Sequence, residues 1–142
     1  MRSKVLRAEG FRWPEVPLRA YADGGPLYRD VTRQEILGRG AGEQALAFET
    51  RYFEVAPGGF SSFERHDHPH AVVVVRGRGE VRLGAESFAL APFDAVYVAP
   101  GEAHQFRAAG DEPFGFLCMV DRERDRPVPV DGSDPAPADG RL

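Results

Sequence analysis

Between residues 45 and 120 the sequence consists of short runs of β-branched and aromatic residues separated by Gly, Pro and Asp. Such runs are typical of β-strands, and no long stretch repeats its apolar residues with a helical period. So many short strands indicate a sandwich or barrel, because one open sheet would leave much apolar surface bare. We therefore predict an all-β core. Its expected strands are residues 46–55, 60–66, 71–76, 80–83, 87–90, 95–99, 104–107 and 114–120.

Residues 1–44 contain Pro14, Pro17, Pro26 and two adjacent glycines, which interrupt regular structure too often for long elements. We expect an irregular N-terminal arm that packs on the barrel or on a partner subunit. One short helix is expected within it, because Thr32 precedes Glu35 by three residues in a capping-box arrangement and a glycine follows shortly afterwards.

Residues 121–142 form a polar C-terminal tail, DRERDRPVPVDGSDPAPADGRL, with several prolines and few bulky apolar side chains. A segment with so little to bury is expected to be disordered or to lie loosely on the surface. Its charges alternate in sign and no aromatic residue interleaves with them, so we expect a solvated run rather than a nucleic-acid surface.

The composition also argues against several partners. The 142 residues carry 18 basic and 22 acidic side chains, so the net charge of -4 provides no electrostatic footprint for nucleic acid or an anionic membrane. The apolar run at 71–75 is far too short to span a bilayer, and the N-terminal residues lack the apolar core of a secretory signal. We expect a cytoplasmic protein with a small-molecule partner. The single cysteine, Cys118, is expected to be a small buried hydrophobe.

Three of the four histidines, His66, His68 and His70, fall within five positions. Residues two apart in a strand face the same side, so Glu64 and His66 would project together, and a tight turn would bring His70 beside them. His104 begins another expected strand and could complete the site. Imidazoles bind zinc, copper, iron and nickel, and an added carboxylate widens the choice to manganese. The alternative is a surface turn with solvated imidazoles.

This arrangement resembles the first motif of the cupin superfamily, G(x)5HxH(x)3,4E(x)6G. With Gly77 as the last glycine, His70 occupies the glutamate position, His66 and Glu64 occupy the two histidine positions, and Gly58 begins the motif. The intervals fit, although two residue types are exchanged. The resemblance implies a metal held by Glu64, His66, His70 and His104.

A second register takes His66 and His68 as the HxH pair, but it leaves one residue before His70 where the family has three or four. In the first register, His68 lies on the turn. It could act there as an acid or base, replace Glu64 as a ligand, or remain a solvated loop residue.

Residues 93–108 resemble the second cupin motif, G(x)5PxG(x)2H(x)3N, at Gly101 and His104. Phe93, Ala99 and Ala108 stand where that motif has glycine, proline and asparagine. The resemblance implies a single-domain cupin-type β-barrel, a double-stranded β-helix or jelly roll, over residues 45–120.

By resemblance, the function is that of a metal-binding cupin using one divalent transition metal (Fe, Mn, Ni or Zn). The expected reactions are dioxygenase-like chemistry, isomerisation or decarboxylation of a small molecule, with Glu64, His68 and Tyr97 as candidate catalytic residues. Alternatives are a non-catalytic cupin that senses a small ligand and a barrel without metal. The run at 71–75 shows no polar alternation, so both faces of that strand are expected to be buried. The arm could cover the outer face, or a homodimer could, as in many cupins.

Overall fold

The computed structural model describes residues 2–20, 28–39 and 42–131, which form strands and no helix. Within these ranges, accordingly, no helix is long and apolar enough to cross a membrane. The strands are β1 (Arg19–Ala20), β2 (Arg29–Leu37), β3 (Phe48–Phe60), β4 (Glu64–Arg65), β5 (His70–Arg76), β6 (Gly79–Leu83), β7 (Glu86–Leu90), β8 (Ala95–Val98), β9 (His104–Ala108), β10 (Phe114–Asp121) and β11 (Val128–Pro129).

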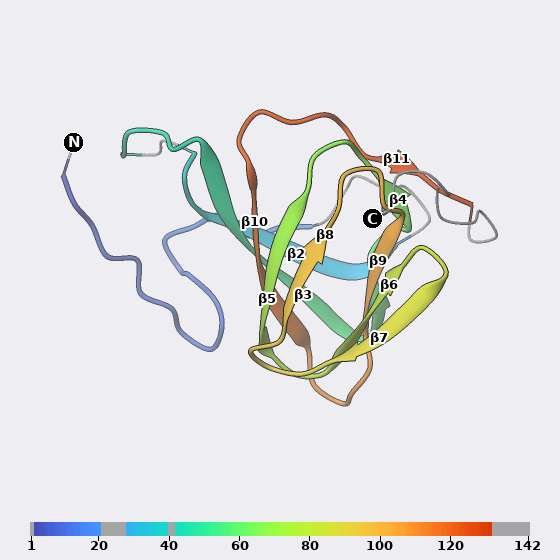
Figure 1. The fold of residues 1–142 in the computed structure, drawn as a ribbon. Helices are drawn as coiled ribbons and strands as arrows, with labels where there is room; N and C mark the ends of the chain where they lie inside the picture. The colour runs from blue at the N-terminus through green and yellow to red at the C-terminus, as the bar shows by residue number, and fades with distance from the viewer. Residues whose placement is uncertain (1, 21–27, 40–41, 132–142) are drawn as a thin grey trace.

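The strands form one antiparallel sheet that curls around a common interior (Figure 1). Its main path runs β11-β4-β9-β3-β10-β5-β8, while β2 adds to β3, and β6 joins β9 to β7. Neighbours in this order are often far apart in the chain, which is the pattern of a jelly roll rather than a meander. The all-β barrel of jelly-roll type expected from the sequence is confirmed.

The helix expected in the N-terminal arm is wrong. Its residues belong to β2, which pairs with β3 from Arg29↔Phe60 to Leu37↔Thr50. Capping residues are a weak local signal, whereas a neighbouring strand offers a row of backbone partners. Val31 is buried in the core on this strand. The barrel sheet therefore begins before residue 45.

β3 is longer than the expected strand because it continues through Pro57 and two glycines. Up to Val55 it pairs with both β2 and β10, and at Phe60 it pairs with Arg107 of β9. Gly58 has φ +79°, a left-handed conformation that glycine adopts without steric cost. The bend at this glycine lets one strand serve two parts of the curled sheet.

The barrel interior is filled by valine and phenylalanine side chains. The rings of Phe53 and Phe106 both stack on Phe116, with centroid distances of 5.5 and 4.6 Å. On β5, Val72 and Val74 are buried, but Ala71 is exposed and the other two valines are only half-buried. Within this single chain, the expected burial of both faces of the strand is met on the inner face alone, and cover of the outer face by a second subunit stays a prediction.

Part of the N-terminal arm is held against the outside of the barrel by Gln34. This side chain is 2% exposed, accepts a hydrogen bond from the amide of Trp13, and donates to the carbonyls of Trp13 and Val16. The Trp13 ring also lies 5.3 Å from that of Tyr52 on β3. A buried amide with these partners fixes the arm on β2.

The described part of the C-terminal tail differs from a loosely attached segment. β11 pairs with β4, and Val130 is buried against Phe63 and Ala103. The prolines did not prevent docking because β11 is a two-residue edge strand, where a missing N–H is tolerated. Residues 132–142 of the tail, also expected to be disordered or loosely attached, lie outside the described residues.

Candidate metal centre

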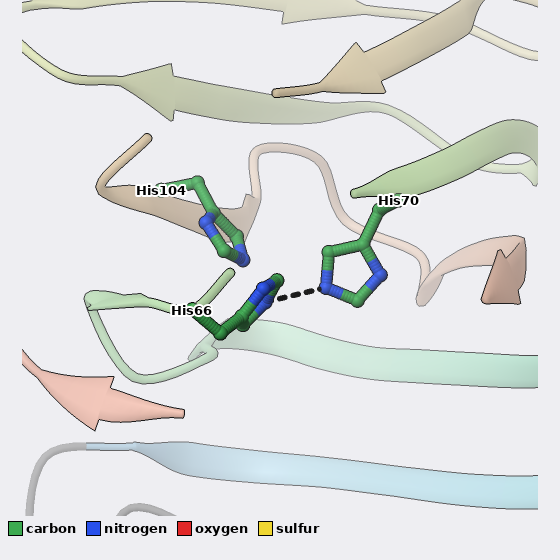
Figure 2. A group of neighbouring side chains, drawn as sticks. All are labelled: His66, His70 and His104. Atoms are coloured by element: carbon green, nitrogen blue, oxygen red, sulfur yellow. Dashed lines mark hydrogen bonds between the residues drawn. The ribbon is translucent and has the colours of Figure 1, made fainter. Parts of the chain in front are cut away.

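Three histidines from separate segments converge in one pocket of the barrel (Figure 2). His70 and His104 begin β5 and β9, and His66 follows β4 directly. The register Glu64↔His104 places the first residue of β4 beside the first residue of β9, and the turn after His66 returns the chain to His70. We call His66, His70 and His104 the histidine cluster.

Each ring of the histidine cluster is oriented by a contact at Nδ1. The Nδ1 atoms of His66 and His104 lie 2.6 and 2.8 Å from the carbonyl oxygens of His68 and Glu102. A carbonyl only accepts, so both Nδ1 atoms carry the proton and both Nε2 atoms are left with a lone pair. Nδ1 of His70 lies 2.9 Å from Sγ of Cys118, and its Nε2 faces Nε2 of His66.

This geometry fits a transition metal. One ligand atom from each ring lies within 4.8 Å of the others. Metal-bound histidines are commonly oriented by a hydrogen bond at the second ring nitrogen, as found here. Metal–nitrogen bonds of about 2.1 Å at right angles would separate two nitrogens by about 3 Å, and the Nε2 atoms of His66 and His70 are 2.8 Å apart.

Burial keeps the rings of the histidine cluster neutral. It lowers the pKa of His66 to about 4, helped by the nearby His104 and His68, and it lowers that of His104 to about 4 as well. Burial and the neighbouring histidines also depress the pKa of His70 strongly. Neutral imidazole is the form that binds a cation.

Glu64, the fourth predicted ligand, is buried and lines the same pocket. It lies outside the group of three whose ligand atoms are mutually close. Its Oε1 accepts a hydrogen bond of 2.6 Å from the Ser62 hydroxyl. Direct ligation by Glu64 therefore stays a prediction.

His68 is 7% exposed rather than solvated. Its ring stacks on that of His66 with a centroid distance of 3.7 Å, and its Nδ1 lies 2.7 Å from Oδ1 of Asp125. The Asp125 carboxylate also accepts the amides of Asp67 and His68, and the Asp67 contact is the main reason that its pKa falls to about 2. The described tail thus helps to hold the histidine turn.

Tyr97, the third candidate catalytic residue, is not brought to the site. It is 66% exposed on β8 and does not line the pocket. Its neighbour Val98 is buried, as the alternation of a strand requires, so Tyr97 faces outward.

Two buried charged residues, Arg51 in the pocket lining and Glu49 beside it, were not expected from the sequence. Arg51 is 6% exposed, and its Nη2 lies 3.4 Å from Sγ of Cys118. Burial raises the pKa of the Cys118 thiol, while Arg51 acts in the opposite direction. Glu49 is fully buried and forms an ion pair of 2.7 Å with Arg124 of the tail. The sequence offered one signal that Glu49 and Arg51 would face the interior. They lie four and two residues before the core residue Phe53 on β3, and residues two apart on a strand share a face.

The comparisons with known proteins agree with this geometry. A family model described as a cupin domain matches residues 51–120. The chain is 50% identical over 118 residues to a 1-methylthio-D-xylulose 5-phosphate methylsulfurylase of Rhodospirillum rubrum, an alignment that covers 82% of this chain and 73% of the relative.

Two solved structures are similar over nearly the whole chain. A cupin-2 domain protein of Rhodospirillum rubrum is 43% identical, with a TM-score of 0.78 and coverage of 94% of this chain and 87% of that one. A cupin 2 conserved barrel domain protein of Rhodopseudomonas palustris is 38% identical, with a TM-score of 0.79 and coverage of 94% and 89%. Sequence motifs, fold and relatives therefore agree that this chain belongs to the cupin superfamily.

Proposed function

We propose that this protein is a metal-dependent enzyme acting on 1-methylthio-D-xylulose 5-phosphate or a closely similar phosphorylated methylthio ketose. The substrate class is suggested by the methylsulfurylase of Rhodospirillum rubrum, which is 50% identical over 118 residues. The observation that carries the proposal is the convergence of three histidine ligand atoms within 4.8 Å in a pocket of the barrel.

The histidine cluster would hold the metal, with Fe, Mn, Ni and Zn as candidates and Glu64 as a further ligand. A divalent metal supplies Lewis acidity, which polarises a ketose carbonyl and stabilises negative charge that develops on its oxygen. Imidazole donors suit the later metals of this series, and a carboxylate suits manganese and iron.

His68 is the residue best arranged to move a proton. Asp125 stays ionised, so it accepts a hydrogen bond from Nδ1 of His68 and leaves Nε2 of this ring as the basic nitrogen. A histidine held by a carboxylate in this way is suited to general acid–base catalysis.

The apolar side of the pocket suits the methylthio group. Phe53, Phe106 and Phe116 line it together with the histidines. Sulfur makes favourable contacts with aromatic rings, and an apolar wall excludes water from the reacting carbons.

Turnover of 1-methylthio-D-xylulose 5-phosphate by purified protein of known metal content tests this proposal. We expect consumption of the substrate in the presence of a thiol reductant, followed by mass spectrometry, and its loss in His104→Ala. Tyr97→Phe is the matched control, because this exposed side chain lies outside the pocket. Protein that carries stoichiometric metal but leaves the substrate unchanged would contradict the proposal.

Two alternatives from the sequence have distinct outcomes in the same experiment. Dioxygen uptake with enols or catechols would favour dioxygenase-like chemistry. Stoichiometric metal and tight binding of a small molecule without turnover would favour a non-catalytic sensing cupin. A cytoplasmic location and a homodimer remain predictions, and sedimentation of the purified protein tests the second.

A further inference from the structure

A second cavity opens beside the histidine pocket, with a volume of about 380 Å3. It shares Arg124 and Pro127 with the histidine pocket. We call it the arginine cavity; it is lined by Arg39, Arg122, Arg124, Asp125, Arg126 and Pro127.

We infer that the arginine cavity binds the phosphate group of the substrate whose other end lies at the histidine cluster. This inference rests on the proposed function and adds the residues that recognise the phosphate. In a phosphorylated methylthio pentulose, the sulfur and the phosphate are at opposite ends of the carbon chain. Two adjoining cavities of different character match such a molecule.

The folded tail separates residues of opposite charge, although residues 122 and 123 lie in a bend and not in an extended strand. Arg122 and Arg124 are partly buried, with side chains 39% and 16% exposed, whereas Glu123 between them is 89% exposed. The charged run, expected to be a solvated segment, therefore places its arginines at the cavity, while Glu123 is exposed to solvent and lies 3.8 Å from Arg122.

The charge of the cavity lining favours an anion. Four guanidinium groups are present against the single carboxylate of Asp125, and that carboxylate is engaged by His68 and by two backbone amides. Glu49 pairs with Arg39 at 2.8 Å and with Arg124 at 2.7 Å, which fixes these two cations in place and offsets one positive charge. Glu35 lies 3.4 Å from Arg39 and Glu123 lies 3.8 Å from Arg122, but neither carboxylate lines the cavity. Among the residues that line the cavity, cations therefore outnumber carboxylates.

Arg122 provides a second indication. Its Nε is buried and has no hydrogen-bond partner within the described part of the chain. A buried N–H without a partner is costly, and a phosphate oxygen in the cavity would supply the missing acceptor. Guanidinium groups match phosphate geometry because they present planar pairs of donors.

The histidine pocket suits the phosphate less well. Its volume is about 90 Å3, and its lining includes the Glu64 carboxylate and three phenylalanines besides the histidines and two arginines. A doubly charged group placed there would meet a carboxylate and an apolar wall in a small space. The phosphate is therefore assigned to the arginine cavity and the methylthio end to the apolar pocket.

The kinetic test uses the substitutions Arg122→Gln and Arg126→Gln, singly and together, in metal-loaded full-length protein. For 1-methylthio-D-xylulose 5-phosphate we expect KM to rise by about tenfold or more in the double variant, with a much smaller change in kcat and unchanged metal content. For unphosphorylated 1-methylthio-D-xylulose, wild type and double variant should have similar kcat/KM. Arg78→Gln, on the exposed turn between β5 and β6, is the matched control. Unchanged KM in a double variant that folds like wild type would overturn the inference while leaving the proposed function intact.

A binding test does not depend on turnover. Inorganic phosphate should raise the melting temperature of the metal-free protein, and this shift should be lost or much smaller in the double variant but retained in Arg78→Gln. Circular dichroism establishes that the variants fold. Absence of a phosphate effect in wild type, or an equal effect in the double variant, would overturn the arginine cavity as a phosphate site even if the enzyme turned over its substrate.

Discussion

The Nε2 atoms of His66 and His70 lie 2.8 Å apart, and in the described part of the chain neither nitrogen has a carbonyl or carboxylate partner. Since Nδ1 of His66 donates to a carbonyl, its Nε2 carries a lone pair directed at the other ring. Two imidazoles that meet in this way must share one proton or one cation. A metal would satisfy both nitrogens together with His104.

Removal of a ring of the histidine cluster should abolish tight metal binding. We expect His70→Ala to lower metal affinity by at least about tenfold. Removal of a residue that only orients a ligand already costs about this much affinity, and removal of the ligand itself should cost no less. His68→Ala should keep its metal, because His68 lies outside the close group. Elemental analysis and metal titration measure both. Loss of metal in His68→Ala with retention in His70→Ala would support the alternative register.

Glu64→Gln tests the fourth ligand. A carboxamide keeps the size of the side chain but is a weaker ligand than a carboxylate, so ligation by Glu64 predicts metal binding weakened by about tenfold or more. Ser62→Ala removes the hydrogen bond of 2.6 Å to Glu64 and should have a smaller effect. Full affinity in Glu64→Gln would limit the ligands to the three histidines.

Stability of the metal-free protein should fall as the pH drops from about 6.5 toward 4. The pKa of His104 is about 4 in the folded protein because of burial, against an ordinary value of 6.5. Between these values the unfolded chain binds more protons, so acid favours unfolding; above pH 6.5 the stability is fully present. The contribution of His104 is at most about 1.4 kcal/mol per pH unit.

Urea unfolding at a series of pH values with a chelator present measures this slope, and His104→Gln should reduce it. An equal slope in wild type and variant would contradict the assignment. Metal binding to the folded protein should also persist to lower pH than an ordinary imidazole allows, because protons compete for the cluster only near pH 4.

Asp125 should affect metal binding without contacting the metal. Asp125→Ala removes the acceptor for His68 Nδ1 and for the amides of Asp67 and His68. The turn that joins His66 to His70 would loosen, and we expect metal affinity to fall by about tenfold. Glu123→Ala, on the same segment but 89% exposed, should bind metal like wild type. Equal affinities in the two variants would show that the tail does not support the site.

Phe93 has φ +74° and is 84% exposed. It occupies the position where the second cupin motif has glycine, and the left-handed backbone explains why glycine suits that position. Phe93→Gly should stabilise the protein by about 1 kcal/mol because it relieves this strain. Phe93→Ala keeps the Cβ atom and should gain much less. Denaturant unfolding of both variants distinguishes relief of strain from loss of the exposed ring.

The strand pattern predicted an all-β sandwich or barrel, and the resemblance of the histidine motifs to the cupin superfamily added the barrel and the histidine cluster. Short β-branched runs bury their side chains in a sandwich or a closed sheet, and residues two apart on a strand share a face. Gly58, Gly77 and Gly101 all have positive φ, so the turns of the two motifs also follow from local chemistry.

Tertiary structure decided what local patterns could not. The capping residues near Thr32 favoured a helix, but pairing with β3 made this segment β2, because strand partners outweigh a weak propensity. The sequence left the role of His68 on the turn open; in the structure, Asp125, 57 residues away, and the stacked ring of His66 hold it in the pocket. In the sequence, the alternating charges of the tail did not show which side chains would face the protein. In the folded protein, β11 pairs with β4 and docks the tail. Arg122 and Arg124 then line the arginine cavity, whereas Glu123 is exposed to solvent.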